Sequence, residues 1–427
     1  MKYDPASSSP NELLHNTQIG RTARGKVLRG IAYLMVVSIC AFFPATQAFG
    51  GDDKGGGGGN PSAPTTVQFG ASKFRALESD GSATISVTRT GVTTGTVSVN
   101  YNVGLDDDAT ATATQRTDFV LTAGTLTFAP GETAKSFTVL INKVRVPVPT
   151  IKEAKLLLSN VRGTGAALGN PSRVSFEIEN NDVRHDENEA ENPVDDHGNF
   201  VRQQYHDFLT REPDDIGLAN WRQTLQQCPN GGYGELEHPE CDRVHISAAF
   251  YQSTEFQERG YFVYRFFQAG LGRRPQYKEF VPDMQRVGGA QSPEQETISK
   301  AAYIDDFAQR ADFKAIYDGL TNQQFVDKLE QTAGVHLSNK AQLVSALDNR
   351  QQTRAQVLRA MVESKEVFAK YFNQAFVAMQ YFGYLRRDPD ETGFRNWVET
   401  LDTSGNSRHM IFGFIYSAEY RSRFGKP

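Results

Sequence analysis

The sequence predicts a multidomain protein in which an all-β antiparallel sandwich is followed by an all-α helical repeat domain. From about residue 67 to residue 182 apolar and polar residues alternate, which is the two-residue period of β-strands. After Phe200 the apolar spacing changes to three and four residues, the period of helices. The stretch from Phe200 to Leu225 also returns 176 residues later (376 − 200), at Phe376 to Leu401. Such duplication is typical of folds that gain stability by packing similar units together.

Residues 1–48 are expected to be a signal peptide. Basic residues, the last of them Arg29, precede an apolar run over residues 31–43, and small residues follow up to Ala48. The apolar run is short for a membrane span, yet a single-pass N-terminal anchor remains the alternative. Both interpretations place the rest of the chain outside the inner membrane. We therefore expect an exported protein whose membrane contact is limited to this signal or anchor.

The charge of the chain argues against nucleic-acid binding. The formal net charge is −5, and removal of residues 1–48 would take away five basic and two acidic side chains, which gives about −8. A negative surface disfavours binding to a phosphate backbone. The next segment, residues 49–64, contains five consecutive glycines and is expected to be a flexible linker.

Residues 65–182 are expected to form the sandwich. About seven strands are predicted in this segment, separated by Gly, Pro and Asp turns, as in antiparallel sandwiches. The alternation places one set of apolar side chains on the buried faces of these strands: Ile85, Val87, Val97, Val99, Leu126, Phe128, Phe137 and Val139.

Four phrases of this segment, at residues 77–81, 117–119, 124–133 and 179–182, together resemble the Calx-beta domain of sodium-calcium exchangers and secreted bacterial proteins. The resemblance implies an immunoglobulin-like sandwich. In the calcium-binding members of that family, carboxylates gather at one end of the sheets. Calcium requires six to eight oxygen ligands, so clustered acids on neighbouring loops are what such a site needs.

The resemblance assigns Glu78, Asp118 and Asp182 to the ligand positions of a calcium site. The rest of the pattern is missing, because Lys143 and Arg145 stand where further carboxylates would be needed. Calcium is thus a possible cofactor of the sandwich. The alternative is that these acids cap loops and that the protein has no cofactor.

Residues 183–199 are strongly acidic and lack apolar periodicity, so they are expected to be an exposed interdomain linker. The helical repeat domain is then expected over residues 200–424. Both well-kept copies carry the same residue types at equivalent positions: Tyr205 and Tyr381, Arg211 and Arg387, Pro213 and Pro389, Asp214 and Asp390, Gly217 and Gly393, and Trp221 and Trp397.

Structural roles are predicted for all of these repeat residues. The tyrosines face the core, the prolines end one helix, and the aspartates cap the next. The glycines suit a close approach between helices. The tryptophans are expected to pack in the core rather than to stack on sugars. The arginines are expected to satisfy helix-end carbonyls or to pair with the capping aspartates rather than to grip an anionic partner.

A second element, Phe-x-x-Ser-x-Glu-Phe/Tyr, closes each copy, at Phe250 and at Phe414. Looser versions give about four units of roughly 50 to 60 residues. Its Ser and Glu are interpreted as helix-start signals, since no His recurs at a fixed spacing to form a nucleophile-base pair. The combined pattern resembles domain of unknown function 4214, a bacterial family of secreted and surface-layer-associated proteins. That family is similar to phycobilisome linker domains, which implies a role in assembly and no catalytic residue.

Cys228 and Cys241 are the only cysteines left after removal of the signal. An even count in an exported chain favours a disulfide that closes a short polar insertion. The alternative is a zinc site that adds His238 and His245 to the two cysteines, although the tight Cys-x-x-Cys pairs of such sites are absent.

The sequence therefore predicts a protein that is not an enzyme and that acts at or beyond the cell envelope in adhesion, assembly, cell communication or interaction with the extracellular matrix. Its partner would be an unknown protein or a cell-envelope component. A calcium-responsive binding protein is the first alternative. An extracellular hydrolase is the second, and it would require a pocket with convergent titratable groups.

Overall fold

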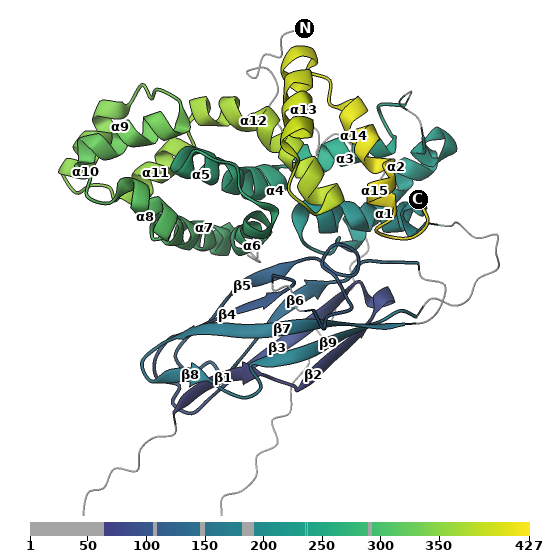
Figure 1. Cartoon of the computed structure of the whole chain (residues 1–427), viewed down its shortest axis with the longest axis horizontal. Coiled ribbons are helices and arrows are strands. Elements are labelled where there is room, and N and C mark those ends of the chain that lie inside the picture. The colour runs from purple at the N-terminus through teal and green to yellow at the C-terminus, as the bar shows by residue number, and fades with distance from the viewer. Residues whose placement is uncertain are drawn as a thin grey trace, which may run out of the picture. The chain divides into compact units, whose positions relative to one another are not determined.

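A computed structural model describes residues 64–105, 109–145, 150–181, 192–234, 236, 238–288 and 293–427. These residues belong to one compact unit that extends from Ser62 to Pro427. Figure 1 shows a β-sandwich followed by a helical region. The predicted signal (1–48), all but the last residue of the predicted glycine-rich linker, Asp182 and most of the predicted acidic linker lie outside the described residues.

The sandwich consists of two sheets, with strand orders β6-β3-β1-β8 and β2-β9-β7-β4-β5. The strands are β1 (Thr65–Phe69), β2 (Lys73–Leu77), β3 (Ser82–Thr90), β4 (Val97–Val103), β5 (Thr122–Phe128), β6 (Ala134–Leu140), β7 (Ile151–Arg162), β8 (Ala166–Leu168) and β9 (Arg173–Glu179). All eight apolar residues that the alternation places inside are buried. The predicted sandwich is confirmed, with more strands than expected.

Two strand pairs are parallel, so the prediction of a wholly antiparallel sandwich is wrong in this detail. β1 runs parallel to β8, and β2 runs parallel to β9. The chain passes from one sheet to the other between β1 and β2, which brings β2 alongside the last strand in the same direction. Gly70 begins this crossing, where an added Cβ would lie 2.3 Å from the Ser86 Oγ atom. A side chain at this position would thus require Ser86 to move.

The second half of the chain is helical, as predicted. Its α-helices are α1 (His197–Gln204), α2 (Asp215–Gln227), α3 (Arg243–Gln252), α4 (Thr254–Phe256), α5 (Phe262–Leu271), α6 (Tyr277–Gly288), α7 (Pro293–Ala308), α8 (Ala311–Tyr317), α9 (Asn322–Ala333), α10 (Lys340–Asp348), α11 (Arg354–Val362), α12 (Lys365–Gln380), α13 (Glu391–Ser404), α14 (Arg408–Ile415) and α15 (Ala418–Arg421). Three π-helical segments, η4 (Tyr205–Leu209), η6 (Gln257–Tyr261) and η7 (Tyr381–Leu385), continue α1, α4 and α12. Among the described helices, none has the combination of length and apolarity that a membrane span requires.

Helical structure begins before Phe200, so the predicted linker ends too late. A 3-10 turn, η3 (Pro193–Asp195), precedes α1. Asn192 is fully buried, and its side-chain amide donates hydrogen bonds to the carbonyl oxygens of Arg421 (2.9 Å) and Lys426 (2.8 Å). Asp196 caps α1 by accepting a hydrogen bond from the Asn199 backbone. Residues 192–199 therefore belong to the helical fold, because their polar side chains are used in caps and anchors.

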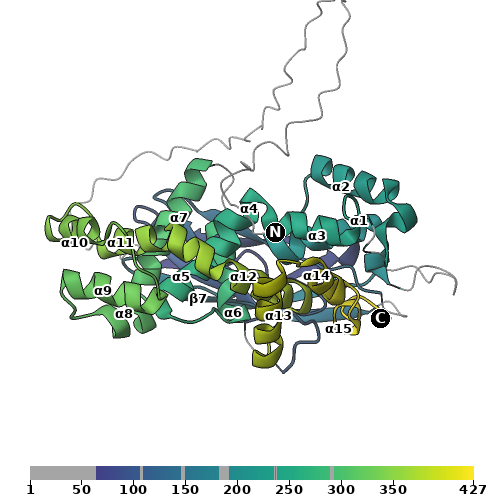
Figure 2. The same cartoon turned by 90° about the horizontal axis from the view of Figure 1, so that it is seen from above.

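The two copies of the duplicated segment pack against each other and do not lie at opposite ends of a linear stack of units. In Figure 2, α1–α3 and α13–α15 lie at one end of the helical region and α8–α11 at the other. The Phe208 ring meets the Tyr384 ring edge-on, with centroids 5.3 Å apart. Gly383 permits this approach, since an added Cβ would lie 3.3 Å from Phe208. The first and last units thus close on one another, and the divergent middle units extend away from them.

Candidate functional site

Glu78 and Asp118, two of the three predicted calcium ligands, lie at the same end of the sandwich. Glu78 lies in the 3-10 turn η2 (Glu78–Asp80) after β2, and Asp118 lies in the loop before β5. Both are buried and line a cavity of about 10 Å³. That volume is roughly the space of one water molecule. The third predicted ligand, Asp182, lies outside the described residues.

Protein groups already bind both carboxylates. The Lys152 Nζ atom lies 2.5 Å from Asp118 Oδ1, and the Asp118 carboxylate also accepts hydrogen bonds from Thr114 N and Thr117 Oγ1, at 2.8 Å each. Glu78 accepts hydrogen bonds from the Val144 backbone and the Asn180 side chain. Within the parts of the chain that the structure describes, no three His, Cys, Asp or Glu side chains are grouped so that they could hold a metal ion.

The cations at this end differ from those that sequence reasoning singled out. Lys143 is near Glu78, with its Nζ atom 4.0 Å from Oε1. Arg145 contributes its backbone, whose N–H donates to the Phe424 carbonyl at 2.5 Å. Lys152, which the sequence interpretation missed, makes the short contact with Asp118. A signal was present, because the period of β7 places Lys152 on the same face as the buried Ala154.

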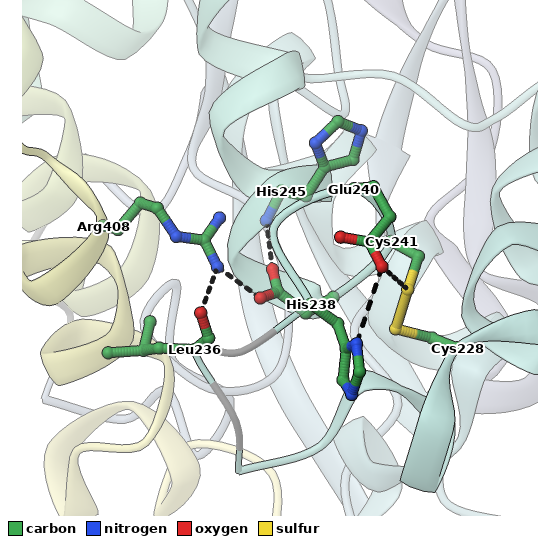
Figure 3. Close-up of a disulfide and its surroundings, with 8 residues drawn as sticks. Cys228, Leu236, His238, Glu240, Cys241, His245 and Arg408 are labelled. Atoms are coloured by element: carbon green, nitrogen blue, oxygen red, sulfur yellow. Dashed lines mark hydrogen bonds and ion pairs between the residues drawn. A yellow bond between two sulfur atoms is a disulfide. The ribbon is translucent and has the colours of Figure 1, made fainter.

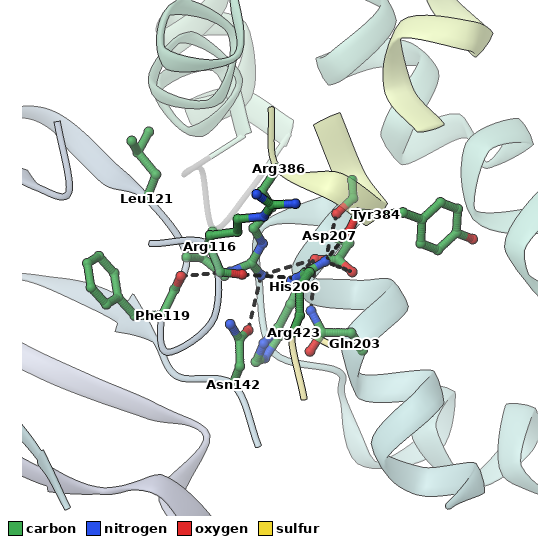
Figure 4. Close-up of polar contacts among 12 residues, drawn as sticks. Arg116, Phe119, Leu121, Asn142, Gln203, His206, Asp207, Tyr384, Arg386 and Arg423 are labelled. Carbon is green, nitrogen blue, oxygen red and sulfur yellow. Dashed lines mark hydrogen bonds and ion pairs between the residues drawn. The ribbon is translucent and has the colours of Figure 1, made fainter. Parts of the chain in front are cut away.

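The same end of the sandwich meets the helical region around Arg386. This residue ends the π-helical segment η7 with a positive φ of 49°, and its side chain is only 2% exposed. Its guanidinium donates to the carbonyl oxygens of Gln115 (2.9 Å) and Phe119 (2.7 Å) and to Asn142 Oδ1 (3.0 Å), all in the sandwich. Figure 4 shows Phe119 and Asn142 on one side of it and Asp207 on the other.

Asp207 lies between two arginines. Its side chain is fully buried, 3.0 Å from Arg386 Nη2 and 3.2 Å from Arg423 Nη2. Gln203 donates a further hydrogen bond to it at 2.8 Å. Burial, and then the positive charge of Arg423, lowers the pKa of the Arg386 guanidinium. Removing one partner from such a buried group of charges costs about 3 to 5 kcal/mol, because another charge is left unpaired in a low-dielectric site.

Further polar contacts and one buried leucine complete this junction. The Arg423 Nε atom donates to the Arg116 carbonyl at 2.9 Å, and the Arg116 side chain forms an ion pair with Glu419. The Gln285 side chain of α6 donates to the Leu121 carbonyl (2.9 Å) and accepts from Ala123 N (3.1 Å), so its amide pairs with the outer edge of β5. Leu121 is fully buried in the apolar core of the helical region. The sandwich and the helices are thus joined by buried polar and apolar contacts.

The repeated arginines have a partner that the sequence did not reveal. Arg211 Nε and Nη2 lie 2.7 and 2.8 Å from the two carboxylate oxygens of Glu255, in the closing element of the same copy. The Arg211 guanidinium also lies over the Tyr205 ring, 4.8 Å from its centre. The predicted turn carbonyl, that of Glu212, is 3.0 Å away, whereas the capping Asp214 is at 3.8 Å.

The second copy repeats this arrangement. Arg387 Nε and Nη2 lie 2.7 and 3.0 Å from the carboxylate oxygens of Glu419, and its guanidinium lies 5.3 Å from the centre of the Tyr381 ring. A related set occurs in a middle unit, where Arg273 lies over Phe267 (5.2 Å) and 3.3 Å from Asp312. The recurring acid in the closing element was the signal, but it was interpreted as a helix start. Both residues do lie at helix starts: Ser253 Oγ and Ser417 Oγ each accept a hydrogen bond from the backbone three residues later, at 3.1 Å, and Glu255 and Glu419 lie in the first turns of α4 and α15. The glutamates have the arginine contact as a second role.

The turn after each arginine has the predicted geometry. Asp214, which follows Pro213, caps α2 by accepting from Gly217 N at 2.8 Å, and Asp390, which follows Pro389, caps α13 by accepting from Gly393 N at 2.7 Å. Gly217 and Gly393 were expected to allow a close approach of helices, and the structure shows which group approaches them. An added Cβ would lie 2.2 Å from the Tyr205 hydroxyl at Gly217 and 2.4 Å from the Tyr381 hydroxyl at Gly393.

Trp221 and Trp397 are half-buried and pack against the helical core. The Trp221 ring lies 5.9 Å from the Phe250 ring, centre to centre. In the first copy the tryptophan thus packs beside the closing phenylalanine.

The structure joins Cys228 to Cys241 by a disulfide, with the two Cα atoms 5.5 Å apart (Figure 3). Sulfurs in a disulfide are not available as the thiolate ligands of the alternative zinc site. The insertion also contacts the second copy, because Arg408 of α14 donates to the Leu236 carbonyl at 3.4 Å and forms an ion pair with Asp242. The Gly234 backbone donates to the Tyr416 hydroxyl at 2.7 Å.

An open cleft of about 400 Å³ lies beside the first copy. It is lined by Arg211, Thr254, Glu255, Glu258, Arg259, Gly288 and Glu296. Its charged side chains pair with one another or with Lys300, which lies 2.7 Å from Glu258 and 3.1 Å from Glu296. The lining residues include no Ser, Cys or His that could serve as a nucleophile or base.

Two family models match parts of this chain. Residues 61–189 match the Calx-beta domain, and residues 368–424 match a domain of unknown function (DUF4214). Both sequence resemblances are thereby confirmed, the second for the last copy of the repeat and its closing element. No curated protein matches the chain significantly.

Solved structures of Calx domains are also similar to part of the chain. The apo-form Calx CBD1 domain is 25% identical, and the match covers 28% of this chain and 99% of that one, with a TM-score of 0.25. The Calx CBD2 domain is 20% identical, with 27% and 86% of the two chains covered and a TM-score of 0.24. The calcium binding domain CBD12 of CALX1.1 is 25% identical, with a TM-score of 0.25; the match covers 28% of this chain and 47% of that one, so this chain spans about half of its length.

Proposed function

We propose that this chain is a non-catalytic, exported or cell-envelope protein that acts in adhesion or assembly, with the sandwich and the helical repeats held together as one rigid binding unit. The Calx-beta match of residues 61–189 supports a calcium-related or extracellular role in broad terms. The observation that carries the finer proposal is the buried junction at Arg386, which binds three groups of the sandwich and Asp207 of the helical region at once.

The pairing of the repeat residues supports a role without catalysis. The arginines bind glutamates, the aspartates cap helices, and the tryptophans pack on the core. A catalytic site needs titratable groups that converge on a substrate and are not already used by the fold. The repeats instead use their charged side chains to hold the helical units together.

The use of the sandwich end as a junction supports a calcium-independent role. Lys152 supplies a positive charge at Asp118, close to Glu78 in the same small cavity. A divalent ion entering there would have to displace a bound ammonium group and would gain few free oxygen ligands. The sandwich then acts as a spacer that holds the helical region in place. A calcium-responsive binding protein is the alternative to be tested.

The test uses the chain from residue 49 to residue 427 immobilised on beads and exposed to a detergent-solubilised envelope fraction. We expect the same bound component with 1 mM EDTA and with millimolar calcium, and loss of that component when the Arg386→Ala variant is used. A screen of the same protein against peptide, ester and glycoside substrates should show no turnover. Turnover that one polar substitution abolishes would overturn the proposal, as would capture that requires calcium.

A further inference from the structure

The two well-kept copies of the repeat differ in what lies against them. Their closing elements are related by 164 residues (414 − 250), which makes Glu255 equivalent to Glu419 and Arg259 equivalent to Arg423. In both copies the glutamate pairs with the repeated arginine, Arg211 or Arg387. The same polar surface is thus presented twice in one molecule.

The surface of the second copy is occupied by a loop of the sandwich. Arg116 pairs its guanidinium with Glu419, while its own carbonyl oxygen accepts a hydrogen bond from Arg423 Nε at 2.9 Å. One arginine residue of the loop is therefore recognised twice, through its side-chain charge and through its backbone. Figure 4 shows Arg116 and Arg423 at this junction.

The equivalent surface of the first copy is the 400 Å³ cleft described above. Glu255 lies in its wall, and Arg259, the equivalent of Arg423, lies beside it. The Arg259 Nε atom is buried and has no hydrogen-bond partner among the described residues, whereas the equivalent Nε atom of Arg423 binds a loop carbonyl. A buried donor without an acceptor is costly, so a carbonyl oxygen from an incoming loop could stabilise this atom, as the Arg116 carbonyl does at Arg423 Nε.

The cleft also carries an acid that the second copy lacks. Glu258 stands where the second copy has Ser422, and the Glu258 side chain is 57% exposed at the rim of the cleft. A carboxylate in that position can accept a guanidinium in the bidentate geometry that arginine favours. Glu255 already pairs with Arg259, and Glu258 already pairs with Lys300. An arginine that enters the cleft would share these carboxylates, as Arg116 shares Glu419 with Arg387.

We propose that the cleft beside the first copy binds an arginine-bearing loop of a partner protein, in the manner in which the second copy binds residues 115–119 of the sandwich. A second copy of this chain is not the proposed occupant, because its own Arg116 is held by Glu419 and Arg423. This inference deepens the proposed binding function by naming the chemistry of the partner.

The probe is a fluorescent peptide with the sequence of residues 112–121, titrated against the chain from residue 49 to residue 427 and followed by anisotropy. We expect saturable binding with a dissociation constant below about 1 mM. Replacing the arginine of the peptide by alanine should weaken binding at least tenfold. Absence of saturation up to that concentration would overturn the inference.

Two cleft variants and one control locate the binding. Thr254→Tyr places a ring in the cleft from an exposed position in the first turn of α4, and Glu258→Lys reverses the charge at the rim; each should weaken binding at least tenfold. Thr392→Tyr makes the same exchange at an exposed position in the first turn of α13 and should leave binding unchanged. Unaltered melting curves in all three variants would show that the fold is intact. If Thr254→Tyr fails to fold, the binding measured with Glu258→Lys tests the inference.

Three further outcomes test this inference separately from the proposed function. Binding that is lost in Glu419→Gln but kept in both cleft variants would mean that the peptide exchanges with the sandwich loop, and it would overturn the inference. Capture of an envelope component that survives both cleft variants would do the same while leaving the proposed function standing. Peptide binding at the cleft without capture of any envelope component would support the assignment of the cleft. It would contradict the proposed role at the cell envelope.

Discussion

At the residue scale, the two copies show how one position can acquire a new role without changing the local backbone. Arg386 is equivalent to Thr210 (386 − 176), and both follow a π-helical segment with positive φ angles of 49° and 51°. Such φ angles are uncommon outside glycine and are retained where the surroundings impose them. In the second copy the side chain at this position reaches the sandwich and Asp207. The two copies therefore share a backbone geometry at this position, and only the residue of the second copy reaches the sandwich.

Replacing Arg386 by alanine should destabilise the protein by about 3 to 5 kcal/mol, because it removes one of the two arginines that neutralise buried Asp207 and leaves two sandwich carbonyls without a donor. The measurement is urea unfolding at pH 7. Thr210→Ala at the equivalent position is the matched control, and its effect should stay below about 1 kcal/mol. Equal losses in the two variants would contradict the assigned role of Arg386.

The Arg387–Glu419 pair should make the stability of the protein depend on pH. The hydrogen bonds from Arg387 lower the pKa of Glu419 below its ordinary value of 4.5. A lowered folded-state pKa contributes stability that is present above the unfolded-state value and is lost as the pH falls through the folded-state value. Between pH 6 and pH 3 the urea midpoint should therefore fall less in Glu419→Gln than in the original protein. Parallel pH profiles for the two proteins would exclude a contribution from this pair.

At the element scale, the disulfide-closed insertion distinguishes the first copy from the second. The two motif offsets differ by 12 residues (176 − 164), which is the length of the segment between Cys228 and Cys241. This insertion lies between α2 and α3, and its Leu236 and Gly234 contact Arg408 of α14 and Tyr416 in the other copy. It therefore links the first and last units of the helical region.

Reduction of the Cys228–Cys241 disulfide should lower the free energy of unfolding by about 3 kcal/mol, since the bond reduces the conformational entropy of the unfolded chain. The comparison is guanidinium unfolding of the original protein with the double variant Cys228→Ser and Cys241→Ser. Alkylation of the native protein should label neither thiol until a reductant is added. Two thiols that react freely without reductant would show that the bond does not form.

At the scale of the whole molecule, the sandwich end that holds the candidate calcium ligands is the end that faces the helical region. Glu78 and Asp118 are neutralised by protein groups, and the loop that carries Asp118 also carries Arg116 and Phe119 of the junction. A cation exchanged at this end would therefore act on the contact between the two domains. Lys152 supplies a positive charge at this position.

The melting temperature of the original protein should be the same with EDTA and with about 2 mM calcium, whereas Lys152→Asp should become calcium-dependent and melt at a higher temperature when calcium is added. Thermal unfolding followed by circular dichroism measures both. Lys155→Asp, a change of the same type farther along β7, serves as the control and should show no response to calcium. A calcium response in the original protein would contradict the assigned role of Lys152.

The sequence by itself determined the order of the domains, the strands of the sandwich, the caps of α2 and α13 and the two family resemblances, because each of these depends on local period and short-range hydrogen bonds. It did not indicate the partner of Arg211, the contact of Lys152 with Asp118, or the junction around Arg386. Asp207 and Arg386 are 179 residues apart, and Arg423 and Arg116 are 307 apart. No periodic pattern joins residues at such separations, so only the packing of the sandwich against the first and last helical units decided which charges meet and which surface remained open.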